Sequence, residues 1–232
     1  MKAISVLTGL LIAGSLTACT PPTMVVPGDV LSMQADQIVA TERKKASGAF
    51  VNESFKLGQY EVKDVDRDWD STKSAGFGSF SKEKTTSGYS YLLKTESGEM
   101  KGSCLIEGNE KGISFGGGMS MSKSVSKFGC SCNGSDGTAE VVLDSNNDSK
   151  YEGTVKTRAG EYTIKAIYEA NGSLPTGNPS GYRVDSEKVI AAADVLHPGK
   201  LWLGKELSNE DRDDLTCIFT GLMLYQGKKE SF

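Results

Sequence analysis

Runs of alternating apolar and polar residues, separated by turn-forming residues, dominate the chain from residue 55 onward. Alternation with a period of two is typical of strands that bury one face, and clusters of Gly, Asn, Asp and Ser between the runs indicate turns. Residues 161–168 show the pattern, with Tyr162, Ile164 and Ala166 at alternating positions. Similar runs recur as far as residue 203, so the sequence predicts roughly a dozen short strands.

A helical period replaces this alternation at the carboxyl end of the chain. Ser208 followed by acidic residues is typical of a capped helix start. Apolar residues at helical spacing then form one face, and the opposite face is also apolar through Cys217 and Leu224. A helix that is apolar on all sides is buried on all sides. The segment 209–225 is therefore predicted to lie inside the protein.

A second, shorter helix is predicted over residues 31–46. Leu31, Ala35 and Ile38 fall on one helical face, and cationic residues follow where the helix would end.

These elements predict a mainly β fold of the α+β kind, an antiparallel β-barrel-like domain of about twelve short strands with a buried C-terminal helix. The order of elements resembles the tubby-like fold shared by tubby, scramblase-type and plant defence-type proteins, in which strands wrap a central carboxyl-terminal helix. The resemblance spans residues 55–226 and is carried by Phe55-x-Leu57-Gly58-x-Tyr60, Leu201-Trp202-Leu203 and the helix from Asn209 to Tyr225. The alternative is a lipocalin-like barrel with an external helix, although such a helix should have one polar face.

The amino-terminal residues have the layout of a secretory signal. Lys2 supplies a positive charge, and residues 3–15 form an apolar stretch that is too short for a bilayer, which needs about 20 residues. The next residues, Leu16-Thr17-Ala18-Cys19, resemble the lipobox of bacterial lipoproteins. The resemblance implies that residues 1–18 are removed, and that Cys19 carries a diacylglyceryl thioether and an acylated amino group.

The chain thus divides into a signal peptide (1–18), a lipidated segment with a tether and the short helix (19–54), and a β-rich domain (55–232). In enterobacteria-like sorting, an Asp after the lipidated Cys favours the inner membrane. Thr20 stands there instead, which favours the outer membrane, facing the periplasm. The formal net charge of −4 argues against a nucleic-acid partner.

Four cysteines remain besides the lipidated one, and an even number in an exported chain favours disulfides. Cys130 and Cys132 lie on the same face of a strand, so a bridge between them would be strained. We therefore expect Cys104 to bridge one of the two. Cys217, in the helix, would take the other or stay a buried thiol.

A metal site is the alternative use of these residues. The candidate soft ligands, suited to Cu(I), are Cys130, Cys132, Met119 and Met121. Alternating carboxylates at 64–70, which share a face on a regular strand, and Asp/Asn residues at 144–148 offer oxygen ligands for Ca²⁺. The second group lacks the Gly and Glu of a calcium loop, and polar turns explain both groups.

Catalytic signals are weak. His197 is the only histidine and lies in a His-Pro-Gly turn. A Ser-His-Asp triad would need it as the base, yet no Gly-x-Ser-x-Gly elbow is present. No catalytic residue is assigned, and no cofactor besides the lipid on Cys19. The sequence predicts a membrane-anchored envelope lipoprotein with a non-catalytic binding or structural β-domain, whose partner is an envelope protein, glycan or lipid. The alternative is a copper- or calcium-binding envelope protein.

Overall fold

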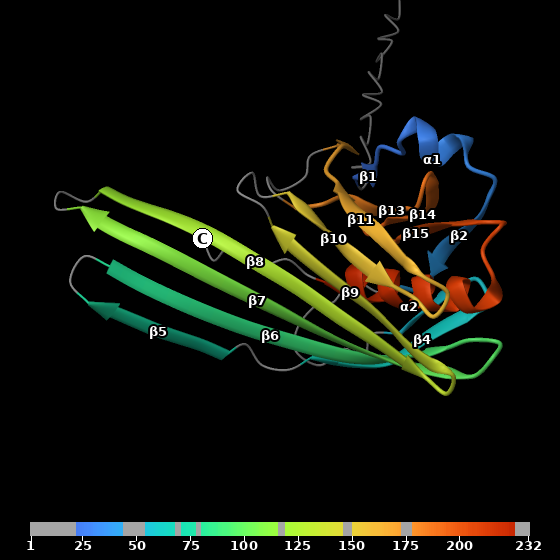
Figure 1. Cartoon of the computed structure of the whole chain (residues 1–232), viewed down its shortest axis with the longest axis horizontal. Coiled ribbons are helices and arrows are strands. Elements are labelled where there is room, and N and C mark those ends of the chain that lie inside the picture. Colours follow the sequence, from blue (N-terminus) through green and yellow to red (C-terminus); the bar gives the residue numbers. More distant parts are fainter. Residues whose placement is uncertain are drawn as a thin grey trace, which may run out of the picture.

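The computed structural model describes residues 22–43, 54–67, 71–77, 80–115, 119–145, 150–172 and 178–225 of the chain. At 71–77, 80–87, 108–115 and 119–126 it describes the backbone alone. Figure 1 shows a curled sheet that surrounds the C-terminal helix.

Twelve antiparallel strands of the described chain close into a ring. Its members, in chain order, are β2 (Ala35–Thr41), β3 (Phe55–Leu57), β4 (Tyr60–Arg67), β6 (Phe80–Lys94), β7 (Glu99–Phe115), β8 (Met119–Gly134), β9 (Gly137–Ser145), β10 (Tyr151–Lys156), β11 (Glu161–Ile167), β13 (Gly181–Asp185), β14 (Val189–Asp194) and β15 (Lys200–Gly204). Around the ring the order is β4-β3-β2-β15-β14-β13-β11-β10-β9-β8-β7-β6, and β6 pairs back with β4. Closure leaves no free edge along the paired part of each strand.

The helix α2 (Asn209–Leu224) fills the ring. It begins after Ser208, whose hydroxyl accepts a hydrogen bond from the Asp211 amide at 3.1 Å. Every residue from 213 to 224 is buried, and Ile218 and Phe219 expose no surface at all. Burial of each large apolar side chain contributes about 1.5–3 kcal/mol. The predicted mainly β barrel with a buried C-terminal helix is confirmed, and the alternative with an external helix is wrong.

The strand pairing extends beyond the ring on one side. β5 (Ser71–Phe77) pairs only with β6. β4 pairs with β6 only from residue 89 onward, and β9 pairs with β8 only from residue 127 onward. The remaining parts of β6, β7 and β8 therefore pair with one another and with β5 (Figure 1). We call this four-stranded extension, residues 71–77, 80–87, 108–115 and 119–126, the arm.

The arm makes three strands much longer than the short strands predicted from the sequence. β6, β7 and β8 have 15, 17 and 16 residues. The polar, Gly- and Ser-rich stretches within them have a composition typical of turns. They are nevertheless strand, because continuous antiparallel pairing with the neighbouring strands runs through them.

The helix predicted over 31–46 is wrong. A five-residue helix, α1 (Gly28–Ser32), ends at the start of this range, and β2 occupies Ala35–Thr41. β2 pairs with β15 on one side and β3 on the other, so it closes a gap in the ring. The backbone hydrogen bonds of β2 to β15 and β3 outweigh the weak helical preference of a segment with few apolar residues on one helical face. The ring thus includes part of the 19–54 segment.

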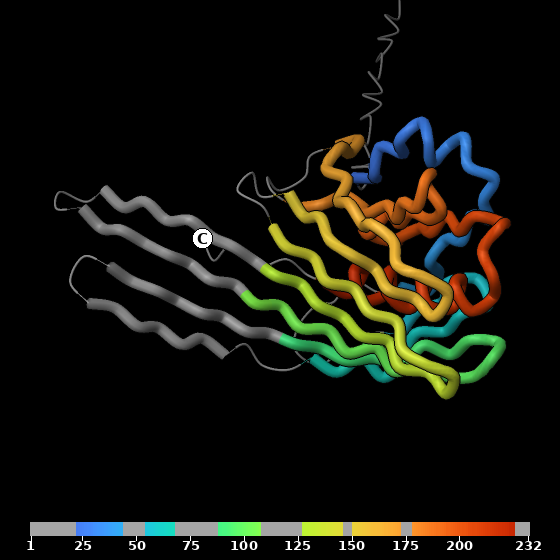
Figure 2. The backbone as a smooth tube through the Cα atoms, viewed as in Figure 1, coloured from blue at the N-terminus to red at the C-terminus, as the bar shows by residue number. Residues whose placement is uncertain are grey.

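The first described residues, 22–33, pack on the outer wall of the barrel (Figure 2). β1 (Thr23–Met24) pairs with β12 (Ala170–Asn171), and the Met24 amide donates to the Asp194 carboxylate at 3.1 Å. Val30 of α1 joins an apolar cluster with Ala192 and Trp202 of the wall.

Candidate functional site

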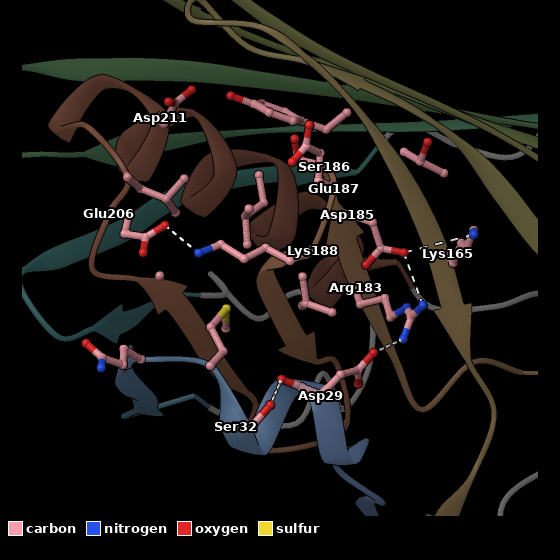
Figure 3. A pocket seen from close by; sticks show the side chains of 18 residues that line it. Asp29, Ser32, Lys165, Arg183, Asp185, Ser186, Glu187, Lys188, Glu206 and Asp211 are labelled. Atoms are coloured by element: carbon pink, nitrogen blue, oxygen red, sulfur yellow. Dashed lines mark hydrogen bonds and ion pairs between the residues drawn. The ribbon is translucent and has the colours of Figure 1, made fainter.

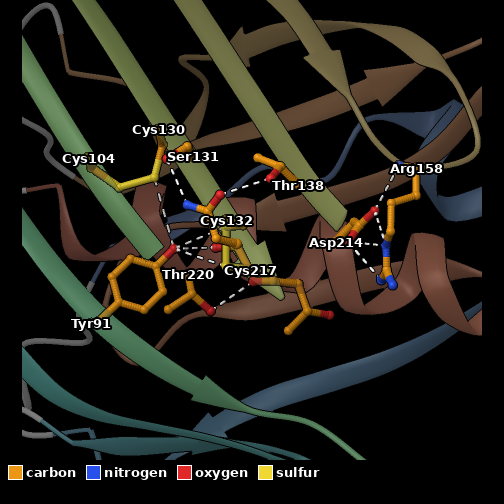
Figure 4. The surroundings of a disulfide bond; sticks show 12 residues. Tyr91, Cys104, Cys130, Ser131, Cys132, Thr138, Arg158, Asp214, Cys217 and Thr220 are labelled. Atoms are coloured by element: carbon orange, nitrogen blue, oxygen red, sulfur yellow. Dashed lines mark hydrogen bonds and ion pairs between the residues drawn. A yellow bond between two sulfur atoms is a disulfide. The ribbon is translucent and has the colours of Figure 1, made fainter. Parts of the chain in front are cut away.

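Two disulfides lie inside the barrel (Figure 4). Cys104 of β7 bonds Cys130 of β8, and Cys132 of β8 bonds Cys217 of α2. This confirms the expected bridge from Cys104 to one of the close pair, and of the two alternatives for Cys217 it shows the bridge to the other cysteine. Because Cys130 and Cys132 are both oxidised, neither offers a thiolate to a Cu(I) ion in this state.

Tyr91 joins the wall to the helix beside these disulfides (Figure 4). Its hydroxyl donates to the Cys217 carbonyl at 2.6 Å and lies 3.6–4.0 Å from the sulfurs of Cys130, Cys132 and Cys217. Burial raises the pKa of Tyr91 well above its usual value, so the phenol keeps its proton. A protonated, enclosed phenol acts here as a structural donor rather than as a base.

Buried acidic residues at the start of α2 close one end of the barrel. Asp214 has no exposed side-chain surface and meets Arg158, with Nη2–Oδ1 at 2.9 Å (Figure 4). The hydrogen bond to Asp214 raises the pKa of Arg158. Two further contacts are Thr157 Oγ1 donating to Asp211 at 2.7 Å and Ser97 Oγ donating to Asp213 at 2.6 Å. The carboxylates therefore clamp hairpin turns to the helix. The sequence alone indicated only that acidic residues are favourable near the amino terminus of a helix, and did not indicate these contacts.

A cavity of about 780 Å³ lies outside the barrel wall, between α1, the β13–β14 turn and the start of α2 (Figure 3). Three ion pairs line it: Arg183 with Asp29 at 2.5 Å, Arg183 with Asp185 at 3.2 Å, and Lys188 with Glu206 at 2.8 Å. The cavity therefore offers both signs of charge within a small space.

Asp185 is the distinctive group in this cavity. Its Oδ2 faces Arg183, with Lys165 4.0 Å away, but its buried Oδ1 has no hydrogen-bond partner. The side chain follows a shift in register between β13 and β14. A buried acceptor without a donor costs about 1–3 kcal/mol, so this position favours an N–H or O–H donor. No local motif marks the cavity, because it joins segments such as Asp29 and Arg183 that are far apart in the chain.

The other sequence-predicted residues do not meet at a common site. Cys19 lies outside the described residues. Met119 and Met121 pair, through the backbone, with Phe115 and Ile113 of the arm. His197 lies between β14 and β15, where its Nε2 forms a hydrogen bond with the Arg43 carbonyl at 2.8 Å.

The acidic groups predicted as oxygen ligands are also dispersed. Asp64 has a positive φ of 52° within a register shift of β4, so the strand is irregular there. Asp64 and Asp66 are both exposed, on either side of Val65, which packs against the core. Residues 68–70 and 146–149 lie outside the described residues. Asp144 forms an exposed ion pair with Lys127 at 3.2 Å. In the part of the chain that the structure describes, no group of three or more His, Cys, Asp or Glu residues is arranged to hold a metal ion.

Comparison with protein-family models, curated proteins and solved structures finds no match to this chain. The resemblances to the lipobox and to the tubby-like fold therefore stay predictions. Across the described ranges, no helix is both long and apolar enough to cross a membrane.

Proposed function

We propose that the protein is a lipid-anchored component of the bacterial cell envelope, held to the outer membrane through Cys19, with the barrel as a non-catalytic binding domain. The observation that carries this proposal is the pair of buried disulfides, one of which joins the barrel wall to its central helix. Structural disulfides persist in oxidising compartments, among them the bacterial periplasm. The signal-like start of the chain and Leu16-Thr17-Ala18-Cys19 agree with that location.

The filled interior directs binding to the outside of the barrel. Ligand-carrying barrels keep an internal space, whereas here α2 and its contacts occupy the centre. The cavity beside α1 is the candidate binding site, and its mixture of charges suits a small zwitterionic ligand. An amine of the ligand would face Asp185 and a carboxylate would face Arg183 or Lys188. The stem peptide of the envelope glycan, which carries both groups, is a suitable probe.

The anchor is tested by metabolic labelling with palmitate, followed by separation of inner and outer membranes. The unchanged chain and Thr20→Ser, which keeps the lipobox cysteine, should both carry label in the outer membrane fraction. Cys19→Ser should carry none and should leave the membrane. Equal labelling of Cys19→Ser and the unchanged chain would refute the anchor.

The cavity is tested by calorimetric titration with a stem peptide. Asp185→Asn should weaken binding about tenfold, since a charge-assisted hydrogen bond contributes about 1.5–3 kcal/mol. Glu152→Gln is the matched control, because Glu152 also pairs with Lys165, at 3.7 Å, but does not line the cavity. Equal affinity of Asp185→Asn and the unchanged chain would exclude this role for Asp185.

A further inference from the structure

The arm reverses the polarity pattern of the ring. In the ring, Cys104 and Cys130 are buried on the inner face, whereas Leu105, the next residue along β7, is 53% exposed on the outer face. The registers of β6 with β7 and of β7 with β8 continue into the arm without a shift. Successive residues of a strand alternate between its two faces, so residues can be assigned to a face by counting from the ring. Arm residues in line with Cys104 and Cys130 form the inner set, and those in line with Leu105 form the outer set. The inner set consists only of Gly, Ser, Thr and Glu residues.

The outer set carries the apolar residues, and they gather at the end of the arm. Register brings four of them to one level across β5, β6, β7 and β8: Phe77, Phe80, Ile113 and Met121. Phe115 pairs with Met119 at the next level outward. The two stretches that contain these residues, 74–81 and 112–122, have no charged residue. The face that meets water in the ring is thus apolar at the end of the arm.

Lysines occupy the levels directly behind this apolar end, in the same outer set. Lys82, Lys111 and Lys123 stand two residues back from the apolar level, and Lys73 and Lys84 two residues further. Two residues of strand span about 6–7 Å. Segments that lie in a membrane surface bury their apolar residues about 5–10 Å deep, while lysines interact with anionic headgroups. The spacing between the two levels matches that depth.

We propose that the end of the arm inserts into the surface of an anionic phospholipid membrane, as a second contact besides the lipid on Cys19. Within the outer set, the charged residues behind the apolar end are all lysines, which are complementary to such a surface, and five lysines in one set favour it over an apolar protein groove. The arm glutamates, Glu83 and Glu110, belong to the inner set. The proposal rests on the proposed envelope location, because an anchored chain keeps the arm close to lipid. Its test omits the anchor, so the two can fail separately.

The test uses the full chain with Cys19→Ser and measures cosedimentation with phosphatidylcholine vesicles, with and without phosphatidylglycerol. The chain should bind the vesicles that contain phosphatidylglycerol, and high salt should release it. Phe77→Ser with Phe80→Ser should weaken binding at least about tenfold. Changing Lys82 and Lys111 to Ala should weaken it about fivefold for each lysine. Leu105→Ser, an exposed apolar residue of the same face within the ring, is the matched control and should bind normally.

Unfolding temperatures of all variants identify any that fail to fold, and the changes to Phe77, Phe80, Lys82 and Lys111 lie in the arm, outside the closed ring. Absence of binding to phosphatidylglycerol vesicles would overturn the proposal, even if the arm captured a protein. A loss of binding in Leu105→Ser equal to that of the Phe pair would also overturn it. Failure of palmitate to label the unchanged chain in cells would refute the anchor, and vesicle binding by the purified Cys19→Ser chain would still support this proposal.

Discussion

Removal of the disulfide between Cys132 and Cys217 should destabilise the protein more than removal of the disulfide between Cys104 and Cys130. The cysteines of the first pair are 85 residues apart and those of the second are 26 apart. The chain-entropy relation gives about 4.6 kcal/mol for the longer loop and about 3.5 kcal/mol for the shorter, a difference of about 1 kcal/mol. The two loops do not overlap along the chain, but the Tyr91 hydroxyl contacts sulfurs of both disulfides. Removal of both should therefore depart from the sum of the two losses by about 0.5–3 kcal/mol.

The assay is urea unfolding of the Cys→Ala pairs, in a Cys19→Ser background that prevents thiol exchange with Cys19. Far-UV circular dichroism and the fluorescence of buried Trp202 report the transition. Alanine is used because a buried serine hydroxyl would add its own desolvation cost. A larger loss for the Cys104–Cys130 pair would refute the reasoning. A loss below about 1 kcal/mol for the Cys132–Cys217 pair would show that packing alone holds α2 in place.

Three further predictions concern other buried contacts. Arg158→Leu should lower the free energy of unfolding by about 3–5 kcal/mol, because it leaves the fully buried Asp214 carboxylate without its partner. Urea unfolding measures this loss, and a loss under about 1 kcal/mol would contradict the prediction. Burial raises the pKa of Asp194, so its contribution to stability is present below the unfolded pKa of about 3.9 and is lost as pH rises through the folded pKa. Stability of the unchanged chain relative to Asp194→Asn should therefore fall as pH rises above about 4, and a difference that is constant with pH would exclude this. Gly102→Ala should destabilise by at least about 1–3 kcal/mol, since its methyl group would overlap the Tyr91 ring; an unchanged melting temperature would argue against that packing.

The sequence predicted the features that depend on local pattern. The second half of the segment 209–225, which is apolar on all sides, required burial, and a central helix in a closed sheet followed from it. The same-face placement of Cys130 and Cys132 led to two separate partners, which the structure has. Both inferences needed only the side-chain period of a helix or a strand.

The features that the sequence did not predict depend on contacts between distant segments. β2 is a strand because β15 and β3 lie on either side of it, and neither neighbour is visible in residues 31–46. The cavity beside α1 exists because Asp29 reaches Arg183 across the outer wall. The arm became apparent only when the registers of β5 to β8 placed distant apolar residues at one level.

Peptide mass spectrometry of the protein extracted from the cell envelope without reduction tests the lipid anchor and the disulfides in one measurement. We expect an acylated Cys19 as the first residue. We also expect two crosslinked peptide pairs, one joining Cys104 to Cys130 and the other joining Cys132 to Cys217. An unmodified Cys19 still attached to Ala18, or free thiols at the other four cysteines, would contradict these expectations.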